Sequence, residues 1–393
     1  MDSARSGDGR ARIVHLDHTG ARGGAELALV RLLNAEPDWR PAVLLPASEP
    51  EDVFAQLPAG VPRLFAGVRQ GTGGSGSSPG RLADLAARLL AQAAATRWHR
   101  SVLTSDLVVA NSTRAAAYGA LAVKGSTRPF VVHLRDLIEP EALGAFGYRL
   151  MTKLILPRAD GVVANSRTTL DSARPFLRDD TVAVSIPSAS GIRGATMSSR
   201  GGGPLRVGML ARIDPWKGQR ELLEAFAAAF PEGDARLELA GGAPFGHDAF
   251  ADELRARAGE LGLAHRVHLL GHVEDTAAVI AGWDVAVQYS TRPEPLGQNV
   301  LQYLAGGAAT VVANEGGPTE WIDDGVNGLR VAPREPASLA RALRRLGEDA
   351  ALRARLGAAG AATPGLLDDA AVVRAHSDAY AEVIARRGAL QLA

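Results

Sequence analysis

Short apolar runs alternate with longer segments in which apolar residues recur every three or four positions. The short runs, rich in Val, Leu and Ile, predict buried strands, and the longer segments predict amphipathic helices. Glycine, asparagine or serine stands at many of the junctions, as is typical of strand-to-helix turns. This order predicts an α/β protein with doubly wound parallel sheets.

The predicted elements fall into two groups. Strands are expected at 12–17, 41–46, 61–66, 106–110, 129–134, 160–164, 181–186, 205–210, 235–240, 267–270, 283–288 and 308–313. Helices are expected at 27–33, 81–98, 143–158, 220–230, 298–304, 337–346, 351–358 and 366–387. Residues 187–204, rich in Gly, Ser and Arg without periodicity, predict a linker between a first domain, 1–186, and a second, 205–371.

Composition narrows the function classes. The chain has 393 residues, enough for two domains, and its 43 basic and 43 acidic residues argue against a nucleic-acid partner. Cysteine is absent, which excludes thiolate metal sites and disulfides. With a polar N-terminus and no apolar run of about 18 residues, a cytoplasmic protein is expected. The oligomeric state stays open.

Two segments allow a structural and a functional interpretation. Residues 143–158 predict an amphipathic helix with basic residues, which either packs on a sheet or makes peripheral contact with the inner face of a membrane. Residues 71–80, GTGGSGSSPG, predict a surface loop, with a lid over an acceptor as the alternative.

The second domain opens with a candidate anion site. The strand at 205–210 leads to Arg212, then Lys217-Gly218, and then a helix. Two cations beside a helix N-terminus can neutralise a diphosphate. The segment lacks G-x-x-x-x-G-K-[ST], so it is not a P-loop, and the alternative is an ordinary loop with surface charges.

A candidate sugar site lies between residues 288 and 327. Glu294 stands before a turn at Gly297, a predicted helix and strand follow, and Gly316-Gly317 make a second tight turn. A carboxylate accepts hydrogen bonds from sugar hydroxyls, and glycine lets an anion approach the N–H groups of a helix start. Ordinary αβ turns are the alternative.

The first domain offers two further candidates. Gly23 and Gly24 lie between the first strand and its helix, where they either let a phosphate or an acceptor approach the backbone or simply make a tight turn. The strand at 129–134 ends in His133, Arg135 and Asp136, and ionisable groups at that end of a parallel strand lie where such sheets bind ligands.

Three motifs in this order resemble retaining glycosyltransferases of family 4, which have the GT-B fold: GGAE at 23–26, Arg212 with Lys217-Gly218, and Glu294-Pro295-Leu296-Gly297. The resemblance implies two doubly wound Rossmann-like domains facing each other across a cleft, with a C-terminal helix, about 372–393, crossing back to the first. It also implies transfer from a nucleotide-diphosphate sugar to a hydroxyl acceptor, with donor and acceptor identities open.

The resemblance assigns roles to individual residues. It places Arg212 and Lys217 on the leaving diphosphate and Glu294 on the donor sugar. The residue beside that sugar is His133, Arg135 or Asp136. The other implied donor contacts are Gly23, Gly24, Leu296, Gly297, Gln298, Asn299, Gln302, His272 and Val273. Gln302 departs from the family pattern, which has a second Glu there for the ribose. A neutral amide loses the charge but keeps one acceptor oxygen.

Metal and cofactor use follow from the same motifs. No D-x-D motif stands out, so we expect no divalent ion, because the two cations do the work that a metal does elsewhere. A nucleotide-sugar epimerase or a degenerate binding subunit with the same fold is the alternative, which Gln302 keeps open. A dehydrogenase is disfavoured because G-x-G-x-x-G is missing.

Overall fold

The structure is a computed structural model that describes residues 9–47, 52–69, 79–192, 203–243 and 247–392. The chain divides into two compact units, Met1–Ser188 with Asp369–Ala393, and Ala189–Asp368. The predicted lid loop and the predicted linker fall largely outside the described residues.

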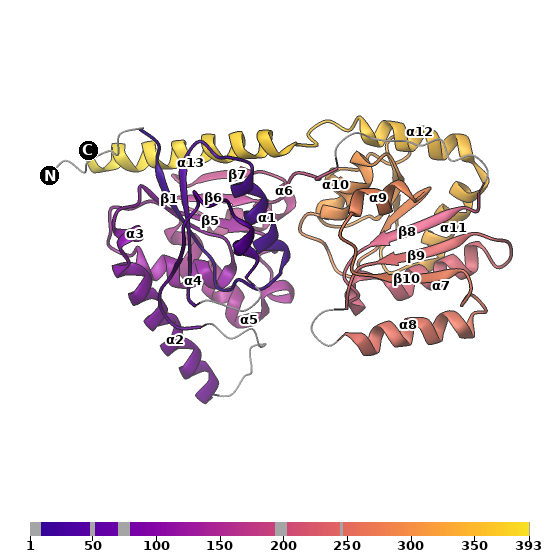
Figure 1. The fold of residues 1–393 in the computed structure, drawn as a ribbon, viewed down its shortest axis with the longest axis horizontal. Coiled ribbons are helices and arrows are strands. Elements are labelled where there is room, and N and C mark those ends of the chain that lie inside the picture. Colours follow the sequence, from indigo (N-terminus) through magenta and orange to yellow (C-terminus); the bar gives the residue numbers. More distant parts are fainter. Residues whose placement is uncertain (1–8, 48–51, 70–78, 193–202, 244–246, 393) are drawn as a thin grey trace. The chain divides into compact units, whose positions relative to one another are not determined.

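The first unit contains a parallel sheet in the order β3-β2-β1-β4-β5-β6-β7, of which β1, β5, β6 and β7 are labelled in Figure 1. Its strands are β1 Arg12–Leu16, β2 Arg40–Leu45, β3 Arg63–Phe65, β4 Leu107–Ala110, β5 Phe130–Leu134, β6 Gly161–Ala164 and β7 Val182–Ser185. In register, Val14 of β1 lies opposite Ala42 of β2 and Val108 of β4. The strand order reverses between β1 and β4, and ligands of open parallel sheets bind at such a switch point.

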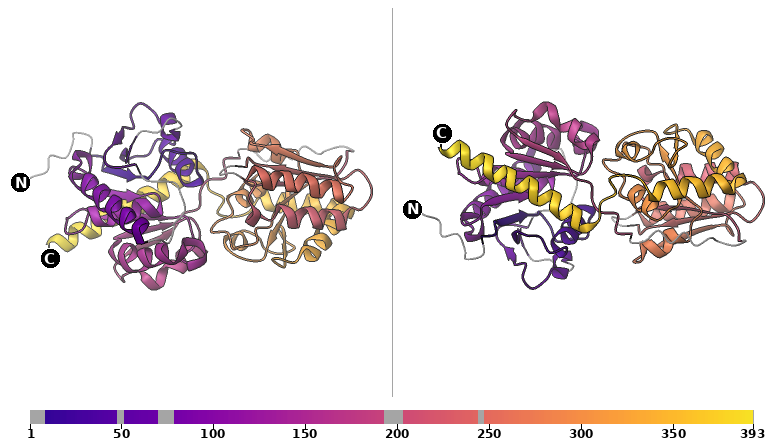
Figure 2. Two further views of the ribbon diagram at one scale, coloured as in Figure 1. Left: turned by 90° about the horizontal axis from the view of Figure 1, so that it is seen from below. Right: turned by 90° about the horizontal axis from the view of Figure 1, so that it is seen from above.

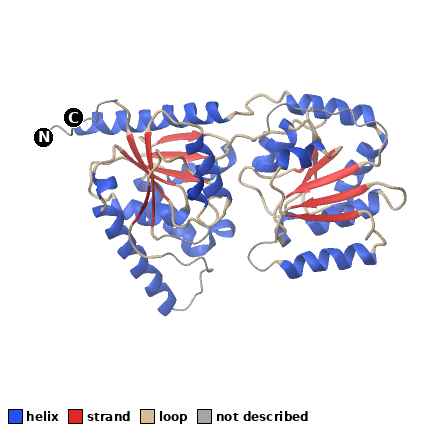
Figure 3. Ribbon diagram, viewed as in Figure 1, coloured by secondary structure: helices blue, strands red, loops and turns tan. Residues whose placement is uncertain are grey.

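Helices cover both faces of this sheet (Figure 3). They are α1 Gly24–Asn34, α2 Pro79–Trp98, α3 Arg100–Leu103, α4 Thr113–Ala122, α5 Pro140–Leu150, α6 Arg167–Ala173 and α13 Asp369–Leu392. The C-terminal helix α13 lies across one face of the first sheet (Figure 2). β4 is buried along its whole length, which explains why its sequence, LVVA, is apolar on both sides.

The second unit repeats the plan with a parallel sheet in the order β10-β9-β8-β11-β12-β13. Its strands are β8 Arg206–Leu210, β9 Arg236–Ala240, β10 Val267–Gly271, β11 Val285–Gln288, β12 Ala309–Ala313 and β13 Leu329–Val331. Its helices are α7 Gln219–Ala229, α8 Asp248–Glu260, α9 Thr276–Ala281, α10 Gln298–Ala305, α11 Pro336–Glu348 and α12 Ala350–Ala361. The switch point lies between β8 and β11. The predicted fold class, two doubly wound Rossmann-like domains, is confirmed.

The helix predicted at 143–158 is a different structure. α5 ends at Leu150, and a π-helical turn, Met151–Ile155, and a 3-10 turn, Leu156–Arg158, follow. Gly144 interrupts α5 with φ 67°, and Pro157 cannot continue the helical hydrogen bonds. Met151, Ile155 and Leu156 belong to the core of the first unit, whereas Phe146 is 44% exposed. In the part of the chain that the structure describes, no helix is both long and apolar enough to cross a bilayer.

Candidate functional site

The loop between β8 and α7 carries both predicted phosphate-binding cations. Arg212 lies just after β8, its side chain is 48% exposed, and its Nη2 lies 3.6 Å from Asp214 Oδ2. Lys217 ends a 3-10 turn, Pro215–Lys217, whose first residues are capped by Asp214. Gln219 Nε2 donates to the backbone oxygen of Arg212 at 2.6 Å, which fixes the start of the loop against α7.

Gly218 allows this loop to pack against β11. It caps α7 with φ +81°, and a Cβ there would lie 1.8 Å from the backbone oxygen of Tyr289. Tyr289 immediately follows β11 and precedes the segment that carries Glu294. The glycine therefore brings Lys217 toward Glu294, a contact between residues far apart in sequence.

Gly218→Ala is expected to be strongly destabilising. A left-handed backbone costs an L-residue roughly 1–2 kcal/mol, and the Cβ must also displace the backbone of Tyr289. The matched control is Gly233→Ala, because Gly233 has φ +91° but open space around its Cβ position. Urea unfolding should show a clearly larger loss for Gly218→Ala. Equal losses of unfolding free energy in the two variants would mean that the close approach to Tyr289 does not contribute to stability.

Lys217 and Glu294 form an ion pair at the switch point. Lys217 Nζ lies 2.5 Å from Glu294 Oε1, and the two side chains are 16% and 11% exposed. Ser290 Oγ donates to the same oxygen at 2.6 Å, and Nζ lies 3.9 Å from the centroid of the Trp216 ring. The ammonium and the carboxylate are thus held in place, and both retain some exposure to a ligand.

The Gly316-Gly317 turn fixes the backbone of Glu294. Gly316 has φ +69°, and a Cβ there would lie 2.6 Å from the backbone oxygen of Glu294. Gly317 N donates to that same oxygen at 2.8 Å, and a Cβ at Gly317 would lie 2.3 Å from the oxygen of Pro295. Side chains at either position would push the carboxylate out of place, so these glycines support Glu294.

The predicted donor contacts after Glu294 lie at the start of α10. Gly297 caps the helix with φ +74°, and Leu296 is buried. Asn299 Nδ2 donates to the oxygen of Leu210 at 3.1 Å and to Tyr303 Oη at 3.2 Å, while Gln298 Nε2 donates to the oxygen of Ala189. These amides tie α10 to the end of β8 and to Ala189, so the N–H groups of the helix start are what can face a ligand.

Tyr303 joins the ends of the two strands at the switch point. Leu210 N donates to its hydroxyl at 2.7 Å, and the hydroxyl donates to the oxygen of Val287 at 3.3 Å. Burial raises the pKa of Tyr303, so the hydroxyl stays neutral. Tyr303 was not among the predicted residues, because its role depends on β8 and β11 lying side by side.

Three other predicted donor residues, Gln302, His272 and Val273, also belong to the second unit. Gln302 Nε2 donates to Thr276 Oγ1 of α9 at 3.4 Å. His272 follows β10, is exposed, and lies beside Gly242 at the end of β9. Val273 packs against the cluster around Trp283. Their contact with a nucleotide stays a prediction.

The predicted first-unit residues occupy different environments. His133 lies within β5, where side chains point to a face of the sheet, and its Nε2 lies 2.8 Å from Tyr380 Oη of α13. Burial and the neighbouring His376 hold the pKa of His133 well below its usual value. Asp136 is exposed beyond the strand end, and Arg135 Nη2 donates to Asn111 Oδ1 at 2.9 Å. Gly23 and Gly24 cap and begin α1, next to Glu26.

Sequence reasoning missed the polar groups gathered at the first switch point. Asp17 and His18 follow β1, Asn111 and Ser112 follow β4, and Asn111 Nδ2 donates to Asp17 Oδ2 at 2.6 Å. The sequence does show polar residues directly after two buried strands. The cluster could not be predicted because the sequence alone does not show that β1 and β4 are neighbours in the sheet.

The second-unit site can bind and stabilise negative charge next to a polyol. Arg212 and Lys217 supply fixed positive charge, the starts of α7 and α10 supply N–H groups, and Glu294 supplies acceptor oxygens. Fixed charges of this kind stabilise a phosphate leaving group without rearranging during the reaction.

Comparisons with known proteins agree with this geometry. Residues 198–363 match the family model described as glycosyl transferases group 1. The lipopolysaccharide core biosynthesis glycosyltransferase LpsE of Rhizobium meliloti is 35% identical over 136 residues, 35% of this chain and 39% of that protein. A D-inositol 3-phosphate glycosyltransferase of Corynebacterium glutamicum is 31% identical over 156 residues, 38% of this chain and 37% of that protein. The matched part thus spans well under half the length of either relative.

Solved structures resemble the chain over nearly its whole length. HepE of Anabaena, solved in complex with UDP and glucose, has a TM-score of 0.77 and 27% identity and covers 95% of this chain and 100% of its own. Sucrose-phosphate synthase from Thermosynechococcus elongatus has a TM-score of 0.78 at 19% identity, covering 96% and 100%. The chain therefore has the GT-B fold of solved glycosyltransferases, and the larger part of its second unit matches the glycosyl transferases group 1 family.

Proposed function

We propose that the protein is a retaining glycosyltransferase that moves a sugar from a nucleotide-diphosphate sugar to a hydroxyl group of an acceptor. The observation that carries the proposal is the Lys217–Glu294 pair, 2.5 Å apart, at the switch point of the second unit. It sets a cation for the diphosphate directly beside a carboxylate for the sugar. The family match of residues 198–363 and the UDP complexes of HepE support the same donor class.

The proposed reaction needs no protein nucleophile. The bond between the anomeric carbon and the diphosphate oxygen breaks, and the electron pair leaves with the diphosphate. The acceptor oxygen bonds to the same face of the anomeric carbon and passes its proton to the departing phosphate oxygen. Arg212 and Lys217 stabilise the negative charge that grows on the diphosphate, so we propose that no divalent ion is required.

The donor and acceptor classes follow from the named relatives. HepE was solved with UDP-glucose, so a UDP-hexose is the proposed donor. Relatives named for lipopolysaccharide core and for D-inositol 3-phosphate point to a carbohydrate or cyclitol hydroxyl as the acceptor. A polysaccharide intermediate and a secondary metabolite both fit this class.

The test combines binding and stereochemistry. A panel of nucleotide sugars is screened by thermal shift, where a ligand at about 100 times its dissociation constant adds roughly 2.7 kcal/mol to stability. Proton NMR of the product then reports the anomeric configuration. An α-linked product from the α-linked donor supports retention. A β-linked product would refute retention, and a panel without any binder would refute the whole proposal.

Gln302→Glu is expected to keep or tighten nucleotide binding. A carboxylate accepts stronger hydrogen bonds from a ribose than an amide does, about 1.5–3 against roughly 1 kcal/mol. Isothermal titration with UDP should therefore give a dissociation constant equal to or up to several-fold below that of the wild type. A large loss of affinity would show instead that the amide donor to Thr276 is what this position needs.

A further inference from the structure

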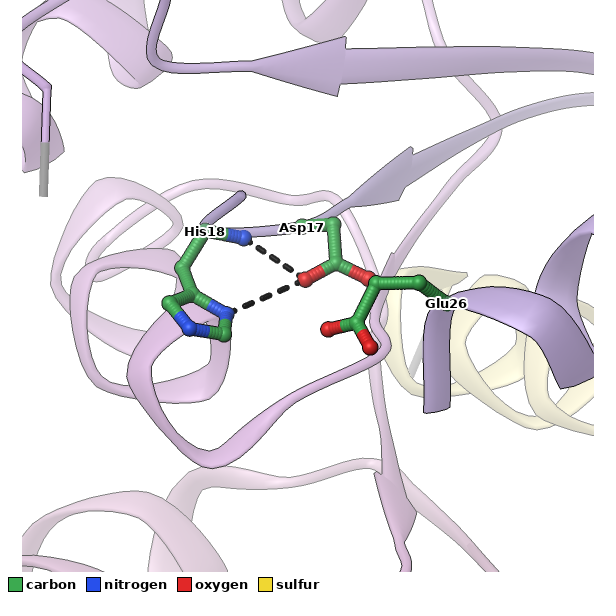
Figure 4. Close-up of side chains that lie close together, drawn as sticks. All are labelled: Asp17, His18 and Glu26. Carbon is green, nitrogen blue, oxygen red and sulfur yellow. Dashed lines mark hydrogen bonds and ion pairs between the residues drawn. The ribbon is translucent and has the colours of Figure 1, made fainter. Parts of the chain in front are cut away.

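A second polar cluster lies at the switch point of the first unit, outside the site described above. Asp17 and His18 follow β1, and Glu26 lies in the first turn of α1 (Figure 4). One ligand atom from each of these side chains lies within 4.8 Å of the others. The cluster thus brings together three groups that bind or transfer protons, at the place where an open parallel sheet binds a ligand.

Asp17 is fully buried and holds its neighbours in place. Its Oδ1 accepts from His18 N at 2.7 Å, and its Oδ2 accepts from Asn111 Nδ2 at 2.6 Å. Tyr118 Oη donates to its backbone oxygen at 2.7 Å. A carboxylate so enclosed does not reach a ligand, so Asp17 acts through the groups that it positions.

His18 is the most exposed residue of the cluster, whereas Glu26 is 5% exposed and Asp17 is fully buried. The side chain of His18 is 19% exposed, and its Nδ1 lies 3.2 Å from Asp17 Oδ1 and 2.8 Å from Ser112 Oγ. Both contacts of the ring within the described residues use Nδ1. Because the negative charge of Asp17 favours the tautomer with the proton on Nδ1, Nε2 keeps its lone pair and can accept a hydrogen bond.

Glu26 supplies a carboxyl group beside this imidazole (Figure 4). A Cβ on Gly23 would lie 2.2 Å from Glu26 Oε2, so the glycine leaves the space that the carboxyl group occupies. Burial, and then the charge of Asp17, raise the pKa of Glu26 to about 7. Near neutral pH the group is therefore present in both forms, and it can donate as well as accept.

The chemistry of the cluster fits a hydroxyl group better than a cation. The oxygens of Asp17 are already engaged by His18 and Asn111, which leaves them poor metal ligands. Arg135, bonded to Asn111, already supplies a positive charge that interacts with Asp17 and Glu26. A hydroxyl group both donates and accepts hydrogen bonds. It can therefore donate to Nε2 of His18 and also form a hydrogen bond with the carboxyl group of Glu26.

We propose that His18 and Glu26 bind a hydroxyl group of the sugar or cyclitol acceptor in the first unit, and that Asp17 and Ser112 position His18 for this contact. The proposal rests on the proposed transferase function and adds to it the residues that recognise the acceptor. Gly23, predicted to let a phosphate or an acceptor approach the backbone, here makes room for Glu26.

The test measures UDP release from UDP-glucose with D-glucose or myo-inositol as the acceptor probe. His18→Asn keeps an amide where Nδ1 contacts Asp17 and Ser112 but deletes Nε2. It is expected to raise the KM for the acceptor roughly 5- to 10-fold, the effect of about one hydrogen bond, with kcat changed far less. His18→Gln, which places an amide near the Nε2 position, is expected to restore part of the loss.

A pH profile separates recognition from mere packing. The wild-type KM for the acceptor is expected to change around pH 7, where Glu26 titrates, and Glu26→Gln is expected to remove that dependence. The matched control is Glu141→Gln on α5, an exposed glutamate of the same unit, which should keep the wild-type profile. Glu26→Gln with an unchanged profile would contradict the proposal even if His18→Asn failed to fold.

The outcomes distinguish this inference from the proposed function. If wild-type protein neither binds UDP nor turns over UDP-glucose, the transferase function fails. If it does both, but His18→Asn leaves the acceptor KM unchanged or weakens UDP binding to the same extent, this inference alone is overturned. It is equally overturned if neither probe accelerates UDP release by the wild type. A rise in melting temperature with Mn²⁺ that is lost in His18→Asn would reassign the cluster to a metal.

Discussion

Lys217→Met is expected to lower kcat by a factor of roughly 10²–10³, the usual effect of removing one group that stabilises charge in a transition state. The ammonium is held 2.5 Å from Glu294 and against the Trp216 ring, so it is in position before the substrate binds. Methionine keeps an unbranched apolar stem but removes the ammonium group, and with it the contact of Nζ with the indole ring. Steady-state kinetics with UDP-glucose measure the effect.

Stability has to be followed alongside turnover in this variant. Loss of Lys217 leaves a largely buried carboxylate at Glu294 with Ser290 as its remaining described side-chain partner. We therefore expect the free energy of unfolding to fall by about 1–3 kcal/mol. This is at or below the range for breaking a fully buried ion pair, because both side chains keep some exposure to solvent. Lys153→Met, on an exposed position of the first unit, is the control. Unchanged kcat in a folded Lys217→Met protein would remove this lysine from the mechanism.

Acidification is expected to destabilise the first unit steeply between about pH 6.5 and pH 4. His15 and His376 lie buried between the first sheet and α13, together with His133 and Tyr380. Burial, together with the neighbouring His376, lowers the pKa of His15 to about 3, and burial lowers the pKa of His376 to about 4. The folded state keeps these rings neutral, so their stabilising effect is complete above the unfolded pKa near 6.5.

Below pH 6.5 the unfolded chain takes up protons that the folded unit does not. Each such histidine then costs up to roughly 1.4 kcal/mol of stability per pH unit, until the folded pKa is reached. Hydrogen exchange of the α13 amides, with the second unit as internal reference, measures the effect. His376→Phe keeps an aromatic ring but has no titrating group. The slope of stability against pH should therefore fall by the contribution of one histidine. An unchanged slope would show that His376 is accessible to protons in the folded state.

Most strands and helices of this fold were predictable because burial dictates their composition, although β13 was missed. β4 and β12 are buried along their whole length, and Gly306-Gly307 follow α10 where a helix should end. α8 was missed because charged residues interrupt its apolar pattern, DAFADELRARAGE, and only one narrow side of the helix is buried. α5 was overextended at its C-terminal end because Pro157 was given too little weight inside an amphipathic pattern.

The candidate site was predictable where its chemistry is local. Lys217-Gly218 and Glu294 are visible as a lysine and a carboxylate next to turn glycines. Their contact is not, because it joins residues 77 positions apart and depends on Gly218 packing against Tyr289. For the same reason Asp17 and Asn111, 94 positions apart, escaped notice. His133 shows the opposite effect, since a polar residue near a strand end was expected at the ligand edge but lies under α13.

The decisive experiment is a crystal structure of the protein with an intact UDP-sugar analogue. We expect the diphosphate oxygens within about 3 Å of nitrogen atoms of Arg212 and Lys217, and a sugar hydroxyl donating to the carboxylate of Glu294. A complex in which the diphosphate lies elsewhere, with the guanidinium and the ammonium both directed into solvent, would contradict it.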